Sequence, residues 1–215
     1  MVASLPRLVS AARLDGGRPS IDFANTIHDR FAAEVEDYIA TPERYAEWAK
    51  HAGAILPGET IKVPAPEEER DRLMAEVRSL RDAVFGLLSA SADGAPLPGA
   101  PLRVANHWLM RAREDQSLNE EGMLMLRAAP DDPYLPLKRI ALDLVDALAD
   151  ARAGRFRLKH CANQQSCGWL FADTSKNGSR RWCAMQTCGT VSKMATRRAK
   201  HGQASEVGAD RQRGP

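Results

Sequence analysis

The sequence predicts an α+β protein, in which a helix-rich N-terminal domain with a small β-sheet precedes a much smaller, cysteine-rich module. Two observations support this prediction. Apolar residues recur at helical spacing through most of residues 1–154, which is typical of amphipathic helices around a core. All four cysteines lie between residues 161 and 188, among strand-like and turn-like segments. We therefore expect domains at 1–154 and 155–201, followed by a disordered tail at 202–215.

Local signals place the helices of the first domain. Thr41 and Pro42 supply an N-cap and a first helical residue, and Gly53 ends that helix. The strongest segment has seven apolar residues at steps of three and four, behind three glutamates that suit the N-terminal end of a helix dipole. The expected helices are at residues 19–30, 42–53, 67–91, 102–113 and 133–153, with a short strand at 123–127.

The formal net charge of +2 is the sum of two opposite parts. Residues 1–150 hold 17 basic and 25 acidic residues, a net charge of −8, whereas residues 151–215 hold 13 basic and 3 acidic residues, a net charge of +10. Such a basic balance on a short segment favours a nucleic-acid partner. The acidic residues alternate with bases along helical faces, which is typical of a solvated surface.

Composition also narrows the cellular setting. No apolar stretch reaches the ~18 residues that a transmembrane helix needs, so we expect no membrane partner. Residues 1–14 lack the continuous apolar region of a secretory signal, which makes the cytoplasm the expected compartment. Because the cytosol keeps thiols reduced, the cysteine cluster favours metal binding over disulfides.

The cysteines are spaced as Cys161-x5-Cys167, then fifteen residues, then Cys183-x4-Cys188. Two short-spaced pairs suit tetrahedral zinc, since each pair covers one edge of the metal. Four thiolates leave no open coordination position, so one structural zinc ion is expected, and it would supply much of the module's folding free energy. Disulfides or redox-active thiols are the alternatives, and His160 is expected to be a bystander.

The residues around the second cysteine pair predict a hairpin and a helix. Residues 169–171 are strand-like, Asn177-Gly178 favours a tight turn, and Arg181-Trp182 would form the return strand. Residues 189–201 contain no proline and are expected to form a helix, with the fourth cysteine at its first turn. A knuckle, a hairpin and a helix bearing the last ligand make up a treble-clef zinc finger.

The module's positive charge marks candidates for contact with phosphates. Trp169, Phe171 and Trp182 are expected to form the module's small core rather than to stack on bases. The nucleic-acid-binding candidates are Lys176, Arg180, Arg181, Lys193, Arg197, Arg198 and Lys200.

A polar cluster in the N-terminal domain is a candidate site for a small-molecule effector, formed by Asp22, Asn25, His28 and His107. The preferred alternative is that Asp22 and Asn25 cap or cross-link neighbouring elements, as buried polar groups usually do. Nothing resembles a phosphate-binding loop, a Ser-His-Asp arrangement or a zinc-protease helix, so the sequence predicts no catalytic residue and no enzyme.

Residues 160–200 closely resemble the CGNR-type zinc finger of bacterial transcription regulators, through the four cysteines, residues 169–171, Asp173, Ser175, Asn177 and residues 180–183. The upstream part resembles the ABATE domain that accompanies this finger, through Gly16-Gly17, residues 21–26 and the helix of Trp48. This resemblance implies a stress- or ligand-responsive regulator with an N-terminal sensing domain. One departure is Thr190-Val191, where the family has Asn-Arg, so a base or phosphate contact from that arginine is missing here.

Together, these observations predict a DNA-binding transcription regulator with one structural zinc ion. The runner-up is a non-enzymatic protein-interaction adaptor whose zinc finger only stabilises the fold. A third hypothesis, an enzyme in the N-terminal domain, requires that Asp22, His28 and His107 converge on one pocket. The sequence leaves the oligomeric state and the effector open.

Overall fold

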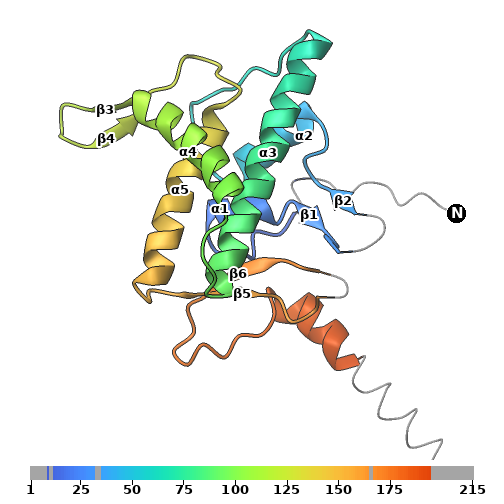
Figure 1. Cartoon of the computed structure of the whole chain (residues 1–215). Helices are drawn as coiled ribbons and strands as arrows, with labels where there is room; N and C mark the ends of the chain where they lie inside the picture. Colours follow the sequence, from blue (N-terminus) through green and yellow to red (C-terminus); the bar gives the residue numbers. More distant parts are fainter. Residues whose placement is uncertain (1–8, 10–11, 32–34, 165–166, 195–215) are drawn as a thin grey trace, which may run out of the picture.

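The structure, a computed structural model, describes residues 9, 12–31, 35–164 and 167–194, and it has the predicted α+β architecture (Figure 1). Three antiparallel two-stranded sheets accompany the helices. The helices are α1 (Pro19–Ala24), α2 (Pro42–His51), α3 (Glu67–Ala92), α4 (Gly99–Glu114), α5 (Leu135–Arg152) and the π-helical turn η2 (Met185–Gly189). The strands are β1 (Ile27–His28), β2 (Glu36–Asp37), β3 (Gln116–Leu118), β4 (Leu124–Leu126), β5 (Arg157–His160) and β6 (Leu170–Asp173).

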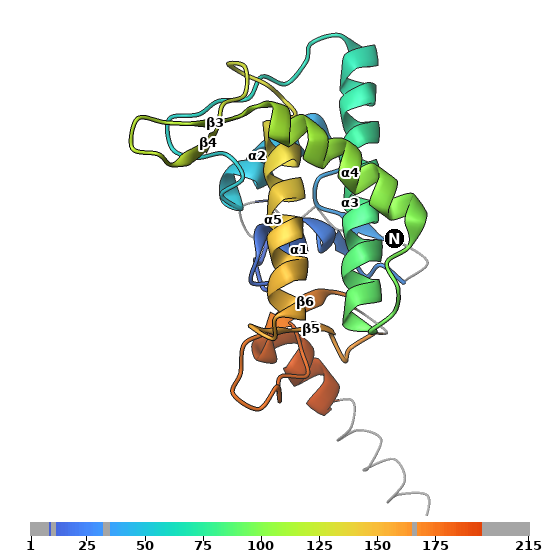
Figure 2. The same cartoon turned by 60° about the vertical axis from the view of Figure 1, so that its left-hand side comes forward.

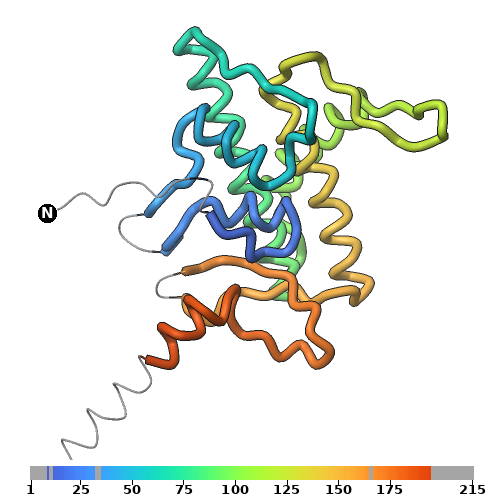
Figure 3. The backbone as a smooth tube through the Cα atoms, turned by 180° about the vertical axis from the view of Figure 1, so that it is seen from behind, coloured from blue at the N-terminus to red at the C-terminus, as the bar shows by residue number. Residues whose placement is uncertain are grey.

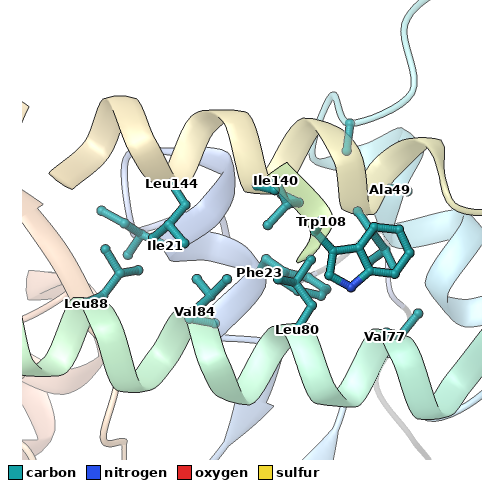
Figure 4. Close-up of a cluster of buried hydrophobic side chains, with 14 of the residues drawn as sticks. Ile21, Phe23, Ala49, Val77, Leu80, Val84, Leu88, Trp108, Ile140 and Leu144 are labelled. Atoms are coloured by element: carbon teal, nitrogen blue, oxygen red, sulfur yellow. The ribbon is translucent and has the colours of Figure 1, made fainter. Parts of the chain in front are cut away.

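The core lies between α3 and α5, with α1 across one side and α4 packed on both long helices (Figure 2). The apolar stripe predicted for α3 points into it, and Leu80, Val84 and Leu88 face Ile140 and Leu144 of α5 (Figure 4). The large aromatic side chains Phe23, Trp48 and Trp108 are also fully buried there. Burial of each such side chain stabilises the fold by about 1.5–3 kcal/mol, so this cluster holds the helical body together.

Most predicted helix limits are close to those observed. The Thr41 hydroxyl accepts a hydrogen bond from the Arg44 amide at 3.3 Å, as an N-cap should. The prediction that the first helix continues to Arg30 is wrong, because α1 ends at Ala24 and the chain then forms β1, which pairs with β2. Asp37 at the end of β2 receives two hydrogen bonds from the buried Arg81, and this ion pair fixes the β1–β2 ribbon against α3.

Strand β6 pairs with β5, not with a strand after the Asn177-Gly178 turn, so the predicted hairpin is wrong. Gly178 does lie in a turn with a positive φ of 59°. The chain beyond it is held instead by Asp173, whose carboxylate accepts hydrogen bonds from Ser175, from the Arg180 amide and from Lys159. Beyond Arg180, the Arg181 carbonyl accepts a hydrogen bond from the Ala162 amide at 2.8 Å, and no strand forms at Arg181-Trp182.

The other edge of β6 is closed by the segment that contains α1. The Asn25 side chain donates to the Leu170 carbonyl at 2.8 Å and accepts from the Leu170 amide at 2.9 Å. The Gly16 carbonyl accepts from the Ala172 amide at 2.8 Å. A Cβ on Gly16 would lie 2.7 Å from Ile21 Cγ2, so only glycine fits this close approach. Strand β6 is therefore paired on both edges, and the cysteine-rich module is built onto the helical body.

In the part of the chain that the structure describes, no helix is both long and apolar enough to cross a bilayer.

Replacement of Asn25 by alanine should lower the free energy of unfolding by about 2–4 kcal/mol, because it leaves the buried Leu170 amide and carbonyl without partners. Urea unfolding of the zinc-loaded protein measures this. Asn106→Ala is the matched control, since Asn106 is exposed on α4 and should change stability by less than about 0.5 kcal/mol. Equal effects of the two substitutions would contradict the role assigned to Asn25.

Candidate metal centre and basic surface

The four cysteines come from three pieces of chain that meet below the helical body (Figure 3). Cys161 follows β5 directly and Cys167 precedes β6, so the β5–β6 hairpin loop supplies the first pair. Cys183 lies in the loop after β6, and Cys188 lies in η2, after which residues 190–194 continue as an α-helix. The fourth cysteine therefore lies in the first turn of a helix, as predicted. The part of that predicted helix beyond residue 194 lies outside the described residues.

The four Sγ atoms lie within 4.8 Å of one another, and all four side chains are buried. Cys183 Sγ lies 3.6 Å from both Cys167 Sγ and Cys188 Sγ. A tetrahedral zinc ion with Zn–S bonds of about 2.3 Å places its sulfur atoms about 3.8 Å apart. A disulfide, in contrast, needs about 2.05 Å. The spacing fits zinc, and the four thiols are free.

The ionisation of the clustered thiols also favours a bound cation. Hydrogen bonds from Cys167 and Cys183 lower the pKa of Cys161 to about 2, so one thiolate is readily held. The thiols that donate to Cys161 then ionise with difficulty: this hydrogen bonding and burial raise the pKa of Cys167 and of Cys183. A divalent cation offsets half of the charge of four thiolates, and this donor set binds zinc strongly.

Aromatic rings from both parts of the chain surround the cluster. Trp169 and Tyr38 pack edge to face with centroids 6.4 Å apart, and Trp169 Nε1 donates to the Ile27 carbonyl at 2.9 Å. Phe171 is fully buried beside them and Trp182 is half-buried, which agrees with the predicted small core. His160 Nε2 lies 3.3 Å from the Ser89 hydroxyl on α3, so this side chain interacts with the helical body.

Comparison with protein families agrees with this geometry. A family model described as "Putative stress-induced transcription regulator", the ABATE domain, matches residues 17–160, about two thirds of the chain. The chain belongs to this family. A second model, the CGNR zinc finger, matches residues 157–201 and includes all four cysteines. The CGNR finger therefore holds one structural zinc ion through Cys161, Cys167, Cys183 and Cys188. A search of curated proteins finds no match.

The predicted phosphate-binding residues have different surroundings. Lys176, Arg181 and Lys193 are exposed on the CGNR finger. Arg180 instead lies inside it: its guanidinium donates to the carbonyls of Trp182 and Cys183 and lies 4.5 Å from the centre of the Phe171 ring. Arg180 thus braces the loop that carries the third cysteine. Arg197, Arg198 and Lys200 lie outside the described residues.

Sequence reasoning missed the pair that organises this loop. Asp173 is 1% exposed, and burial alone would oppose its ionisation. The hydrogen bonds from Lys159 and Ser175 outweigh burial and hold the pKa of Asp173 well below its usual range. Lys159 also donates to the carbonyls of Gly178 and Arg180. One sequence feature could have pointed to this role: Asp173 is the single acidic residue among the many basic residues of the finger.

The four effector candidates lie in different surroundings. Both polar groups of the Asn25 amide are hydrogen-bonded to the backbone of β6. Asp22 is buried and accepts a hydrogen bond from the Gly16 amide at 2.8 Å. His107 is exposed on α4. His28 lines a cavity of about 290 Å³ between the ABATE domain and the CGNR finger, where its ring meets Trp169 edge to face. The cross-linking alternative therefore describes Asp22 and Asn25.

Zinc removal should disorganise the CGNR finger but leave most of the helices of the ABATE domain, whose core contains no metal ligand. A chelator should release about one zinc ion per chain. Trp169 and Trp182 fluorescence should change strongly, while far-ultraviolet circular dichroism keeps most of its helical signal. Re-addition of zinc is the control and should restore the fluorescence. Full retention of the fluorescence after zinc loss would contradict a structural ion.

The buried Asp22 predicts a pH dependence of stability. Burial raises its pKa to about 7, far above the 3.8 of an exposed aspartate. The folded chain thus keeps a proton that the unfolded chain has lost, so this residue lowers stability as pH rises from about 4 to about 7. Asp22→Asn should remove that slope and raise the free energy of unfolding at pH 8 by up to about 3 kcal/mol. Denaturant titrations across this range test it, with the exposed Asp146→Asn as the control that keeps the native slope.

Proposed function

We propose that this family member regulates transcription by binding DNA through the exposed basic surface of its CGNR finger, and that it has no enzymatic activity of its own. The observation that carries the proposal is that Arg181 and Lys193 line one groove of about 760 Å³ on the finger. Both side chains are exposed, and the groove's other lining residues are uncharged: Ala162, Trp182, Thr190, Ser192 and Met194.

The chemistry of this groove suits a phosphodiester backbone. Two cations beside a half-buried indole offer charge for phosphates and an apolar surface for sugars. Acidic residues are scarce nearby, since Asp173 is buried and neutralised by Lys159. The net charge of +10 on residues 151–215 adds long-range attraction. Reduced thiols suit a zinc site in the cytoplasm, where we place this activity.

The departure from the Cys-Gly-Asn-Arg motif weakens this binding relative to other members. The Thr190 hydroxyl donates to the Met185 carbonyl at 3.1 Å and so closes the π-helical turn. Val191 is 52% exposed at the position of the family's arginine. The finger keeps its fold at this motif but lacks one surface cation there. We interpret it as a treble-clef variant, because the β5–β6 loop supplies the first two ligands and the helical turn supplies the last one.

A sensing role has one supporting observation. The cavity beside His28 is lined by Tyr38 of the ABATE domain, by Trp169 and Val191 of the finger, and by the zinc ligands Cys167, Cys183 and Cys188. A small, mostly apolar effector in this cavity would contact both parts at once and could change how the finger meets DNA. The alternative function, a protein-interaction adaptor, needs neither the basic groove nor this cavity.

The proposal is tested by the salt dependence of binding to mixed-sequence duplex DNA. Removal of one phosphate contact lowers the slope of log affinity against log salt by about 0.9. The double variant Arg181→Ala, Lys193→Ala should therefore bind more weakly, with a slope reduced by about 2. The matched control removes the exposed cations Arg103 and Arg113 from α4, which belongs to the ABATE domain, and should retain the slope. Absence of DNA binding by the zinc-loaded native protein would favour the adaptor.

A further inference from the structure

The β3–β4 hairpin projects from the helical body at the end opposite the CGNR finger (Figures 1 and 3). Its register is antiparallel, with Leu118 opposite Leu124 and Gln116 opposite Leu126. Leu118 and Leu124 are 68% and 58% exposed, and Met123 and Met125 are also exposed. A gathering of large apolar side chains on a projecting hairpin is unusual for a monomer's surface and points to an interaction site.

Strand alternation divides these side chains between the hairpin's two faces. Directly opposite residues share a face, and successive residues alternate. Leu118, Leu124 and Leu126 therefore lie on one face with Gln116, whereas Met125 lies on the other face opposite Ser117. A further strand that pairs with the free edge of β4 would lie beside Leu124 and Leu126 and would enlarge this apolar face.

The hydrogen bonds within the hairpin show which backbone groups remain at its outer edges. The Asn119 amide donates to the Met123 carbonyl, and the Arg127 amide donates to the Asp115 carbonyl. Since hydrogen-bonded pairs alternate along an antiparallel ladder, the amides and carbonyls of Leu124 and Leu126 point outward from β4. Those of Gln116 and Leu118 point outward from β3 in the same way.

This edge lacks the features that usually prevent strand pairing. Neither strand contains lysine or proline, and the register has no bulge. Among the strands that the structure describes, β3 and β4 pair only with each other. An isolated two-stranded hairpin is marginally stable in water, and a third or fourth strand stabilises it.

We propose that β4 pairs with β4 of a second copy of this chain, about a two-fold axis at Met125, to form a continuous four-stranded antiparallel sheet. In this register Leu124 lies opposite Leu126 of the second copy, and the two exchange both backbone hydrogen bonds; the symmetry provides the same pair again. Each row across one face then reads Leu118, Leu124, Leu126, Gln116, with the last two from the second copy. Two Met125 side chains meet on the other face.

Charge supports a second copy over an unrelated partner. The turn of the hairpin carries Glu120 and Glu121, and Arg127 stands at the base of β4; all three are exposed, and none has an ion pair in the described structure. Antiparallel pairing of β4 with itself brings the acidic turn of each copy towards Arg127 of the other. The hairpin is thus self-complementary in both hydrogen bonds and charge.

Sedimentation velocity of the zinc-loaded full chain over a range of concentrations tests the proposal, and the native protein should form a dimer. Leu124→Pro removes an outward amide donor from β4 without loss of a hydrogen bond within the hairpin, and should weaken the dimer by about tenfold or more. Leu118→Pro is the matched control: it makes the same change on the outer edge of β3, and its dimer should be retained.

A second pair of variants does not alter the backbone. Met125→Lys places two like charges at the two-fold axis and should abolish the dimer, whereas Ser117→Lys, one strand away on the same face, should leave most of it. A native protein that is monomeric at all concentrations, or equal dimerisation of the two lysine variants, would overturn the proposal. Neither outcome bears on DNA binding, because the hairpin and the CGNR finger lie at opposite ends of the molecule (Figure 1).

Discussion

The closing of the outer edge of β6 by Gly16 and Asn25 is the constraint on which the arrangement of this protein depends. A finger with a single strand pair would leave buried backbone groups unsatisfied, and each such group costs about 1–3 kcal/mol. Here one amide side chain and one glycine carbonyl take the place of a third strand. The same segment forms α1, whose apolar residues Ile21 and Phe23 enter the core between α3 and α5. The orientation of the CGNR finger is therefore fixed by the core of the ABATE domain.

Strand β5 also joins the finger to the core of the ABATE domain. Its hydrogen bonds belong to the finger, since it pairs with β6 and leads directly into Cys161. The side chain of Leu158, and that of Phe156 just before the strand, pack into the core of the helical body. The two family matches overlap at residues 157–160, which is this strand. Zinc stabilises the hairpin loop and the helical body stabilises the strands, so the two parts share β5 and β6.

Features with a short-range signal could be predicted from the sequence. The Thr41 cap, the apolar stripe of α3 and the cysteine spacing each rest on residues close together in the chain. The partner of β6 could not be predicted in this way. Asn177-Gly178 correctly marks a turn, but whether a strand follows depends on Asp173 and Lys159, which come together only in the fold. Asn25 was a ligand candidate because it is polar, and its role as an internal brace depends on the Leu170 backbone, 145 residues away in the chain. Arg180 likewise donates to the distant Asp15 carbonyl at 3.2 Å, in addition to the nearby carbonyls of Trp182 and Cys183.

This internal use of polar groups also changes how the charge of the finger is interpreted. A net charge of +10 counts every base alike. Lys159 is paired with Asp173 and Arg180 is bonded to backbone carbonyls, so neither of these two is free for a phosphate. The electrostatic potential close to the finger still reflects its whole local net charge, because the contributions of neighbouring charges add. Contact affinity reflects only the cations that remain exposed. Composition therefore predicts the positive potential of the finger better than it predicts which of its cations are available for contact.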